Sequence, residues 1–192
     1  MATDTDNTDG PLPGNSAEMA RPSASRLAPE TIAPALAEWL TSKAGSPATI
    51  TKVSPPDGNG MSSETVIVDA EWDGQEHPLV VRVAPSPESD PVFPEYDLDN
   101  QFRLMDYVAK TTDVPVPPLY WSEPSEEVIG APFIVMGRVD GLVPPDVLPY
   151  TFGSWMSEGT QEDRRKLQQE TVQVLADIHA APLPADLLEA PY

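Results

Sequence analysis

The amino-acid sequence predicts an α+β fold in which helices pack on an antiparallel sheet of about five strands. Two runs rich in β-branched residues, 64–72 and 77–85, flank an Asp73-Gly74 pair, which is a strong signal for a β-hairpin. Other segments repeat apolar residues every three or four positions, as amphipathic helices do. The length of 192 residues suits one domain or slightly more.

The composition excludes several kinds of site and partner. The chain has no cysteine and two histidines, His77 and His179, which excludes disulfides, cysteine-ligated zinc, thiol nucleophiles and histidine-rich metal sites. Its 31 acidic and 11 basic residues give a net charge of −20, which repels nucleic-acid backbones and anionic lipid surfaces. We therefore expect no nucleic-acid or membrane partner. An anionic ligand needs a locally positive pocket, so each arginine is informative.

The first residues lack the basic start and apolar core of an export signal, and no run approaches the roughly 18 apolar residues that a membrane span requires. A cytoplasmic location is expected. Residues 1–28 are rich in Asp, Thr, Ser, Pro and Gly, and we expect them to form a disordered acidic tail.

The first helix is predicted from Pro29 to a stop signal at Gly45. Pro34 is placed in its first turn, where a missing N–H does little harm. The segment ATITKVS, residues 48–54, then predicts a strand. The apolar residues of the helix recur at helical spacing, at Ile32, Leu36, Trp39 and Leu40.

A polar turn, PPDGNGMSS, leads into the two strands of the hairpin. On the second of these strands Leu79, Val81 and Val83 share one face, while Val80 and Arg82 share the other. A charged side chain in the middle of a strand points either to solvent or into a cleft. Arg82 is therefore a candidate for a ligand site.

The rest of the chain alternates between helical and extended patterns. Residues 96–110 predict a helix, the proline-rich residues 111–124 an extended segment, and residues 131–141 a buried strand that ends at a glycine. After a proline-rich crossing, a last helix begins at the cap Thr160. The second helix is expected to bury Leu98, Phe102, Met105 and Val108 or Ala109, and the last one carries a stripe of Leu167, Thr171, Leu175 and Ile178.

Six segments between residue 29 and about residue 185 occur in a suggestive order, namely GMSSETVIV, LVVRVAP, QFRLMDYVAKTTDVPVPPLYW, GAPFIVMGRVDG, PPDVLPYTFGSW and VLADIHA. In this order they resemble the aminoglycoside phosphotransferase superfamily, and particularly its acyl-CoA-dehydrogenase-associated phosphotransferase-like branch. The resemblance implies a protein-kinase-like N-lobe over residues 29–139, followed by an inter-lobe crossing and the start of a helical C-lobe over residues 140–192. It also implies a small-molecule kinase that uses ATP, or GTP, with Mg²⁺.

The resemblance assigns the turn to the nucleotide phosphates. Glycine lets the backbone come close to an anion, and serine hydroxyls add donors. The residues so assigned are Gly58, Asn59, Gly60, Met61, Ser62 and Ser63. Taken by itself, a Gly-Asn-Gly turn between strands is also an ordinary hairpin loop.

By the resemblance, Arg82 stands where kinase-like folds place the lysine that binds the α and β phosphates. A guanidinium can bind phosphate in a bidentate manner, through two hydrogen bonds at once. Its alternative role is that of a solvent-facing strand residue. The resemblance places Gln101 as the helix residue that positions Arg82, or Asp97 or Glu95 if the register differs. Gln101 is equally interpretable as an exposed helix residue.

The strand at 131–141 resembles the edge strand that leads to the inter-lobe hinge. Met136 would pack against the base, which favours adenine, and the backbone of Gly137 and Val139 would offer a carbonyl and an N–H. A plain core strand is the alternative. His179, in the segment LADIHA, resembles the histidine that ends the first large helix of the second lobe in this family, and it is interpreted as structural.

The resemblance also requires a His-Gly-Asp loop with a following asparagine and a later metal-binding aspartate, and the sequence contains no such tripeptide. We therefore expect a truncated N-terminal part with no catalytic and no metal-ligating residue. It should transfer no phosphate alone and bind nucleotide at about millimolar strength or not at all. The hydroxyl-bearing acceptor would bind through the missing lobe.

Two other functions are open from the sequence. One is a non-catalytic module with a degenerate kinase-like lobe, which binds a partner or a second copy through the uncovered last helix, where Leu175 and Ile178 would be exposed. The other is an acidic solubility or interaction protein that has inherited the kinase-like pattern but does not use it to bind a nucleotide.

Overall fold

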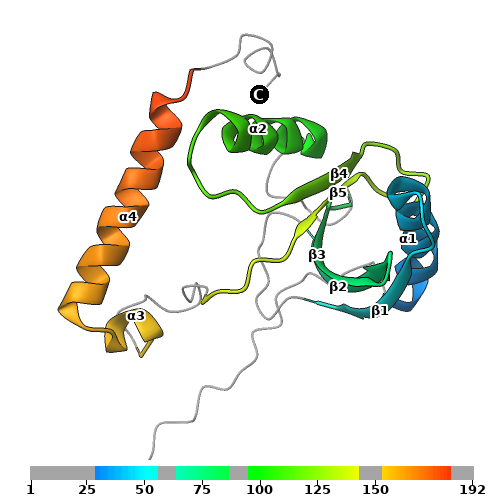
Figure 1. Ribbon diagram of the computed structural model, residues 1–192, viewed down its shortest axis with the longest axis horizontal. Helices are drawn as coiled ribbons and strands as arrows, with labels where there is room; N and C mark the ends of the chain where they lie inside the picture. The colour runs from blue at the N-terminus through cyan, green and yellow to red at the C-terminus, as the bar shows by residue number, and fades with distance from the viewer. Residues whose placement is uncertain (1–28, 56–63, 87–94, 143–152, 183–192) are drawn as a thin grey trace, which may run out of the picture.

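A computed structural model describes residues 29–55, 64–86, 95–142 and 153–182. Its strands are β1 (Thr49–Ser54), β2 (Glu64–Trp72), β3 (Gln75–Val83), β4 (Leu119–Glu123) and β5 (Phe133–Gly137). Within the described ranges these strands form one antiparallel sheet with the order β1-β2-β3-β5-β4. The helices are α1 (Pro29–Ala44), α2 (Leu98–Thr111), α3 (Trp155–Glu158) and α4 (Gln161–Ala180) (Figure 1). The predicted α+β class and five-strand sheet are confirmed, and the arrangement fits a kinase-like N-lobe.

Helix α1 forms one side of the hydrophobic core. Its buried Leu36 and Leu40 pack with Val68 of β2, Val81 of β3 and Val135 of β5, all of which are fully buried. Burial of this kind contributes about 1.5–3 kcal/mol for each large side chain. The core therefore holds α1 firmly against one face of the sheet.

Helix α1 is followed by a glycine that ends it and contains one proline in its interior. Gly45 has a φ of +73°, so the helix stops at a residue that adopts the left-handed backbone easily. Pro34 lies inside the helix as its sixth residue, one turn later than predicted. Proline cannot donate to the Glu30 carbonyl one turn earlier, and the helix nevertheless continues past it.

The hairpin between β2 and β3 forms as predicted. Asp73 and Gly74 have φ values of +52° and +70°. A two-residue turn that matches the twist of its strands requires a positive φ at both central residues. The register runs without interruption from the pair Trp72 and Gln75 at the turn to the pair Glu64 and Val83 at the other end. The turn thereby fixes which residues of β3 face which residues of β2.

Strand β5 lies between β3 and β4, although it follows β4 in the chain. Helix α2 contacts β4 and β5 and has a buried Leu98 at its start. Phe102, Met105 and Val108 are half-buried as predicted, whereas Ala109 is exposed and is not part of the buried side. The helix begins after Asp97, whose carboxylate accepts the Asn100 N–H at 2.9 Å.

Helix α4 begins after Thr160, as predicted. The Thr160 hydroxyl accepts the Asp163 N–H at 3.1 Å, and the Asp163 carboxylate accepts the Thr160 N–H at 3.1 Å, which completes a capping box. The Thr160 hydroxyl also donates to the Asp163 carboxylate at 2.7 Å, and this bond, followed by that of the Thr160 N–H, lowers the pKa of Asp163. The short helix α3 was not predicted; Ser154 caps it.

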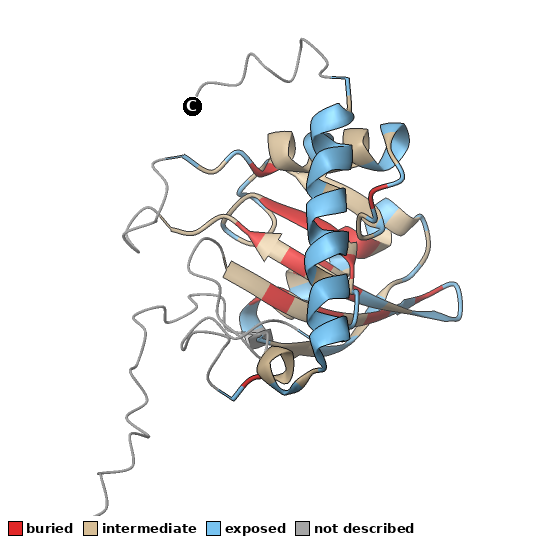
Figure 2. Cartoon of the chain, turned by 90° about the vertical axis from the view of Figure 1, so that its left-hand side faces the viewer, coloured by how far each residue is buried: buried red, intermediate tan, exposed pale blue. Residues whose placement is uncertain are grey.

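Helix α4 stands apart from the sheet and is exposed along its length, with no buried residue (Figures 1 and 2). Val172, Leu175 and Ile178 expose 59%, 51% and 38% of their surfaces. After the helix ends, the Pro182 carbonyl accepts a hydrogen bond from the Tyr107 hydroxyl of α2. None of the helices in the described ranges is long and apolar enough to cross a membrane.

Candidate functional site

The face of the sheet opposite α1 carries Arg82. Val81 and Val83 are buried against α1, and because side chains alternate along a strand, Arg82 between them points to the other side. We call this side the second face. In the described strands it carries Thr65, Ile67, Asp69, Val80, Arg82, Ile134 and Met136.

Arg82 lies at the end of the sheet from which the polar turn leaves. It pairs with Thr65, the second residue of β2, and with Ile134 of β5. Residues 56–63 connect β1 to β2 at this same end. The predicted phosphate-binding residues Gly58, Asn59, Gly60, Met61, Ser62 and Ser63 lie outside the described residues, so their convergence with Arg82 stays a prediction.

An apolar row lies next to Arg82 on the second face. Ile67 of β2 is opposite Val80 of β3, which is opposite Met136 of β5. This row is one alternation along the strands from the row of Arg82, a step of roughly 6.5 Å. All three side chains are partly exposed. The second face therefore combines a cation with a flat apolar surface beside it.

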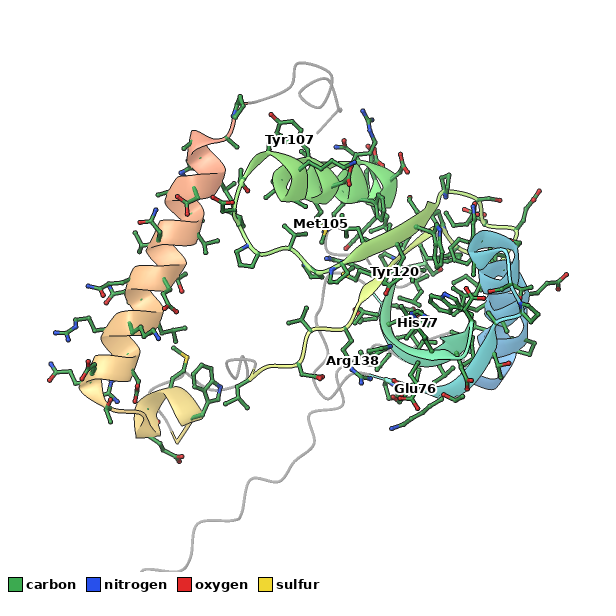
Figure 3. All side chains as sticks on the ribbon, viewed as in Figure 1. Glu76, His77, Met105, Tyr107, Tyr120 and Arg138 are labelled. Carbon is green, nitrogen blue, oxygen red and sulfur yellow. The ribbon has the colours of Figure 1, made fainter. Side chains whose placement is uncertain are left out.

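An ion pair closes the second face on the far side of the apolar row. Arg138, the residue after β5, is labelled in Figure 3. Its Nη1 lies 2.8 Å from Oδ1 of Asp69 on β2, and its Nε lies 3.3 Å from Oδ1 of Asp140. Its N–H also donates to the Pro78 carbonyl of β3 at 2.9 Å. Sequence reasoning missed Arg138, although a basic residue directly after an apolar strand is a notable signal in so acidic a chain.

Gly137 ends β5 in very close contact with Pro118. Its N–H donates to the Pro118 carbonyl at 2.7 Å. A Cβ atom at this position would lie 3.2 Å from three carbons of the Pro118 side chain, which is tighter than ordinary packing, so a larger residue would require Pro118 to shift. Val139 follows with 67% of its surface exposed. After Gly137 the chain therefore leaves the sheet, next to the second face.

Helix α2 places a carboxylate over the row of Arg82. The Ser122 hydroxyl of β4 donates to Oδ1 of Asp99 at 2.8 Å, and Ser122 is opposite Ile134, which is opposite Arg82. Sequence reasoning missed Asp99. The residue that it assigned, Gln101, is half-buried on the same helix, and its pairing with Arg82 stays a prediction.

Asp97 and Glu95, which the sequence offered as alternative partners of Arg82, lie at and just before the start of helix α2. The two histidines lie elsewhere in the structure. Asp97 accepts the Asn100 N–H as the cap of α2, and Glu95 is exposed. His77 stacks on Trp72 with the ring centres 3.3 Å apart, on the core side of the sheet, and His179 is exposed near the end of α4. Among the described residues, no group of three or more His, Asp or Glu side chains is arranged to hold a metal ion.

This chain is similar to a known protein family and to a solved structure. Residues 55–191 match the model of a family described as the phosphotransferase enzyme family. A crystal structure named as that of a "putative aminoglycoside phosphotransferase" from Ralstonia eutropha JMP134 is similar at 28% sequence identity, with a TM-score of 0.40. The similarity covers 65% of this chain and 32% of that one, so the chain spans about a third of that protein's length. Because the family model covers well over half of the sequence, this chain belongs to the phosphotransferase enzyme family.

Proposed function

We propose that the chain is the nucleotide-binding lobe of an ATP-dependent small-molecule phosphotransferase, with the nucleotide on the second face of the sheet. Arg82 would bind the phosphates, and the row of Ile67, Val80 and Met136 would pack against the base. The observation that carries the proposal is the adjacency of this cation and this apolar row on one face. A purine nucleotide has the same division between a flat apolar base and a charged tail.

Electrostatics favours Arg82 as the phosphate ligand. The chain has a net charge of −20, which repels a nucleotide from most of the surface. A guanidinium keeps its charge and matches two phosphate oxygens at once. Arg82 lies at the end of the sheet where β1 ends and β2 begins, so in this proposal the turn that connects these strands would add donors to the same phosphates.

In this proposal the residues of the second face bind and orient the nucleotide. Phosphoryl transfer is accelerated mainly by positioning and by electrostatic stabilisation, and Mg²⁺ in such enzymes neutralises charge on the phosphates. The described carboxylates do not gather into a metal site, so they do not fit the magnesium ion. The two histidines are followed by Pro78 and Ala180 rather than by Gly-Asp. We therefore propose that this chain alone transfers no phosphate.

The proposal is tested by titrating the 192-residue chain with ATP and with adenosine, followed by ¹⁵N NMR. The wild type should bind ATP more tightly than adenosine, and Arg82→Ala should abolish that preference, a loss of about tenfold or more for a charge-assisted contact. Arg82→Lys should retain part of it. Arg165→Ala, which removes an exposed arginine of α4, is the control and should bind like the wild type. An unchanged preference in Arg82→Ala refutes the proposed role.

A second candidate is a partner-binding module that uses α4. It is favoured by the stripe of Leu175 and Ile178, which is exposed in this structure and continues to the half-buried Leu167. Apolar side chains at this spacing on one helix face are typical of a helix that packs against another surface. This candidate requires no nucleotide, so the titration above distinguishes the two.

A further inference from the structure

A second arginine extends the second face beyond the end of β5. Side chains on one face recur at every second residue, so Arg138, two positions after Met136, continues the face that carries Arg82. Its backbone N–H donates to the carbonyl of Pro78, which precedes Arg82 by four residues on β3. Four strand residues span roughly 13 Å. The apolar row therefore lies between two arginines.

Two cations at opposite ends of an apolar surface leave the direction of a bound nucleotide undecided. A flat base packs on the apolar row in either direction, and a guanidinium at either end attracts the phosphates. In a chain with a net charge of −20, each arginine on this face competes for the anion. A single direction of binding requires a feature that distinguishes the two ends.

Two carboxylates surround the guanidinium of Arg138 and supply such a feature. Nη1 donates to Oδ1 of Asp69 at 2.8 Å, and Nε lies 3.3 Å from Oδ1 of Asp140. The side chains of Arg138 and Asp69 are only 31% and 36% exposed, whereas that of Asp140 is 91% exposed. Because water screens an exposed pair more strongly, Asp69 is the main partner. This group carries one negative charge in excess.

The hairpin register brings Asp69 within reach of Arg138. Asp69 of β2 lies opposite Pro78 of β3, and Arg138 is hydrogen-bonded to the other side of Pro78. The Arg138 side chain therefore extends across β3 to β2, parallel to the apolar row. The ion pair lies at the end of the second face that is remote from Arg82.

We propose that Asp69 is a positioning residue that withholds Arg138 from phosphate, so that the nucleotide binds with its phosphates at Arg82 and not in the reverse direction. This inference rests on the proposed nucleotide-binding function and deepens it. Asp69 acts through Arg138 and does not contact the phosphates. Removal of the Asp69 charge releases a second phosphate-binding cation at the far end of the apolar row.

The test asks whether Arg138 replaces Arg82 once Asp69 is neutral. The 192-residue chain is titrated with ATP and with adenosine, followed by ¹⁵N NMR. Arg82→Ala should bind the two equally, as the proposed function requires. Arg82→Ala/Asp69→Asn should regain a preference for ATP of about three- to tenfold, as one restored hydrogen bond to phosphate would give. Adding Arg138→Ala to this double variant should remove the preference again.

The location of the spectral changes is a second readout, which a change in stability alone would not move. Some amide shifts are caused by ATP and not by adenosine. In the wild type these shifts should centre on Thr65 and Val83, which flank Arg82 in the sheet. In Arg82→Ala/Asp69→Asn they should centre on Gly137 and Val139.

Matched variants control for charge and for folding. Arg82→Ala/Asp69→Glu keeps the negative charge and should show no preference for ATP. Glu170→Gln removes the same charge from an ion pair with Lys166 on α4, at 3.7 Å, so Arg82→Ala/Glu170→Gln should also show none. Asp69→Asn keeps the size of the side chain and one acceptor oxygen, and Asp69→Ser is a second neutral variant that should give the same result.

The outcomes separate the inference from the proposed function. If Arg82→Ala/Asp69→Asn shows no preference for ATP, if the preference persists without Arg138, or if Glu170→Gln restores it equally, the inference is wrong and the role of Arg82 stands. If the wild type binds ATP no more tightly than adenosine, or if Arg82→Ala keeps the wild-type preference, the proposed function is wrong and the inference with it.

Discussion

The indole Nε1 of Trp39 donates a hydrogen bond of 2.7 Å to Oε2 of Glu123 and so joins α1 to β4 across 84 positions of the sequence. Lys43 places Nζ at 3.6 Å from the same oxygen, and the Ser125 N–H donates to Oε1 at 3.1 Å. The Trp39 ring also meets Phe133 edge to face, with the ring centres 4.8 Å apart. A polar contact and an aromatic contact together anchor the helix to the far edge of the sheet.

This contact predicts a pH dependence of stability. The hydrogen bond from Trp39, followed by that from Ser125 and the charge of Lys43, lowers the pKa of Glu123. A depressed carboxylate pKa contributes stability above the unfolded value of about 4.3, and that contribution is lost as the pH falls through the folded pKa. Urea unfolding at several pH values between 7 and 3 should show that the wild type is more stable than Glu123→Gln at pH 7.

The difference in unfolding free energy between the two proteins should shrink as the pH falls below about 4.3. Glu127→Gln, which neutralises an exposed carboxylate nearby in the chain, is the control. A difference that stays constant down to pH 3 would show that the charge of Glu123 does not contribute to the folded state.

The contact between Gly137 and Pro118 predicts a local packing cost. In Gly137→Ala the new Cβ would lie 3.2 Å from the Pro118 side chain, so β5 or the segment before β4 must shift. We expect a loss of about 1–3 kcal/mol in unfolding free energy, measured by urea denaturation. Gly141→Ala is the matched control, because its Cβ would meet no atom within 4 Å. Equal stability of the two variants would contradict the close packing.

The exposed face of α4 predicts concentration-dependent association. Leu175→Glu combined with Ile178→Glu should reduce binding of the dye ANS and should shift the chain toward the monomer in size-exclusion chromatography, because both side chains are exposed apolar surface. Gln161→Glu with Gln169→Glu adds the same charge away from the stripe and should leave association unchanged. A wild-type chain that elutes as a monomer and binds no ANS would argue against this role for the helix.

Local patterns were sufficient for much of the fold. The hairpin at Asp73 and Gly74, the alternation along β3 and the cap at Thr160 are all as predicted, because turn chemistry, side-chain alternation and capping depend on residues close in sequence. The short helix α3 was missed, since four residues are too few for a periodic pattern.

For the candidate site, the orientation of one residue was predicted. Alternation was enough to place Arg82 on the face opposite the core, and that placement is confirmed by the burial of Val81 and Val83. Asp99 and Arg138 were not found, because their positions depend on Ser122 and Asp69, which lie 23 and 69 residues away in the sequence. No local pattern connects residues at that separation.

The sequence by itself determined the longer helices, the strands of the hairpin, the two faces of β3 and the side of the sheet to which Arg82 points. Only the tertiary structure decided that β5 enters between β3 and β4, which brings Met136 beside Val80, sets Arg138 across from Asp69 and places Pro78 and Pro118 on either side of the strand's end. The physical reason is that strand order results from hydrogen bonding and packing between distant segments, whereas periodicity is a property of neighbours.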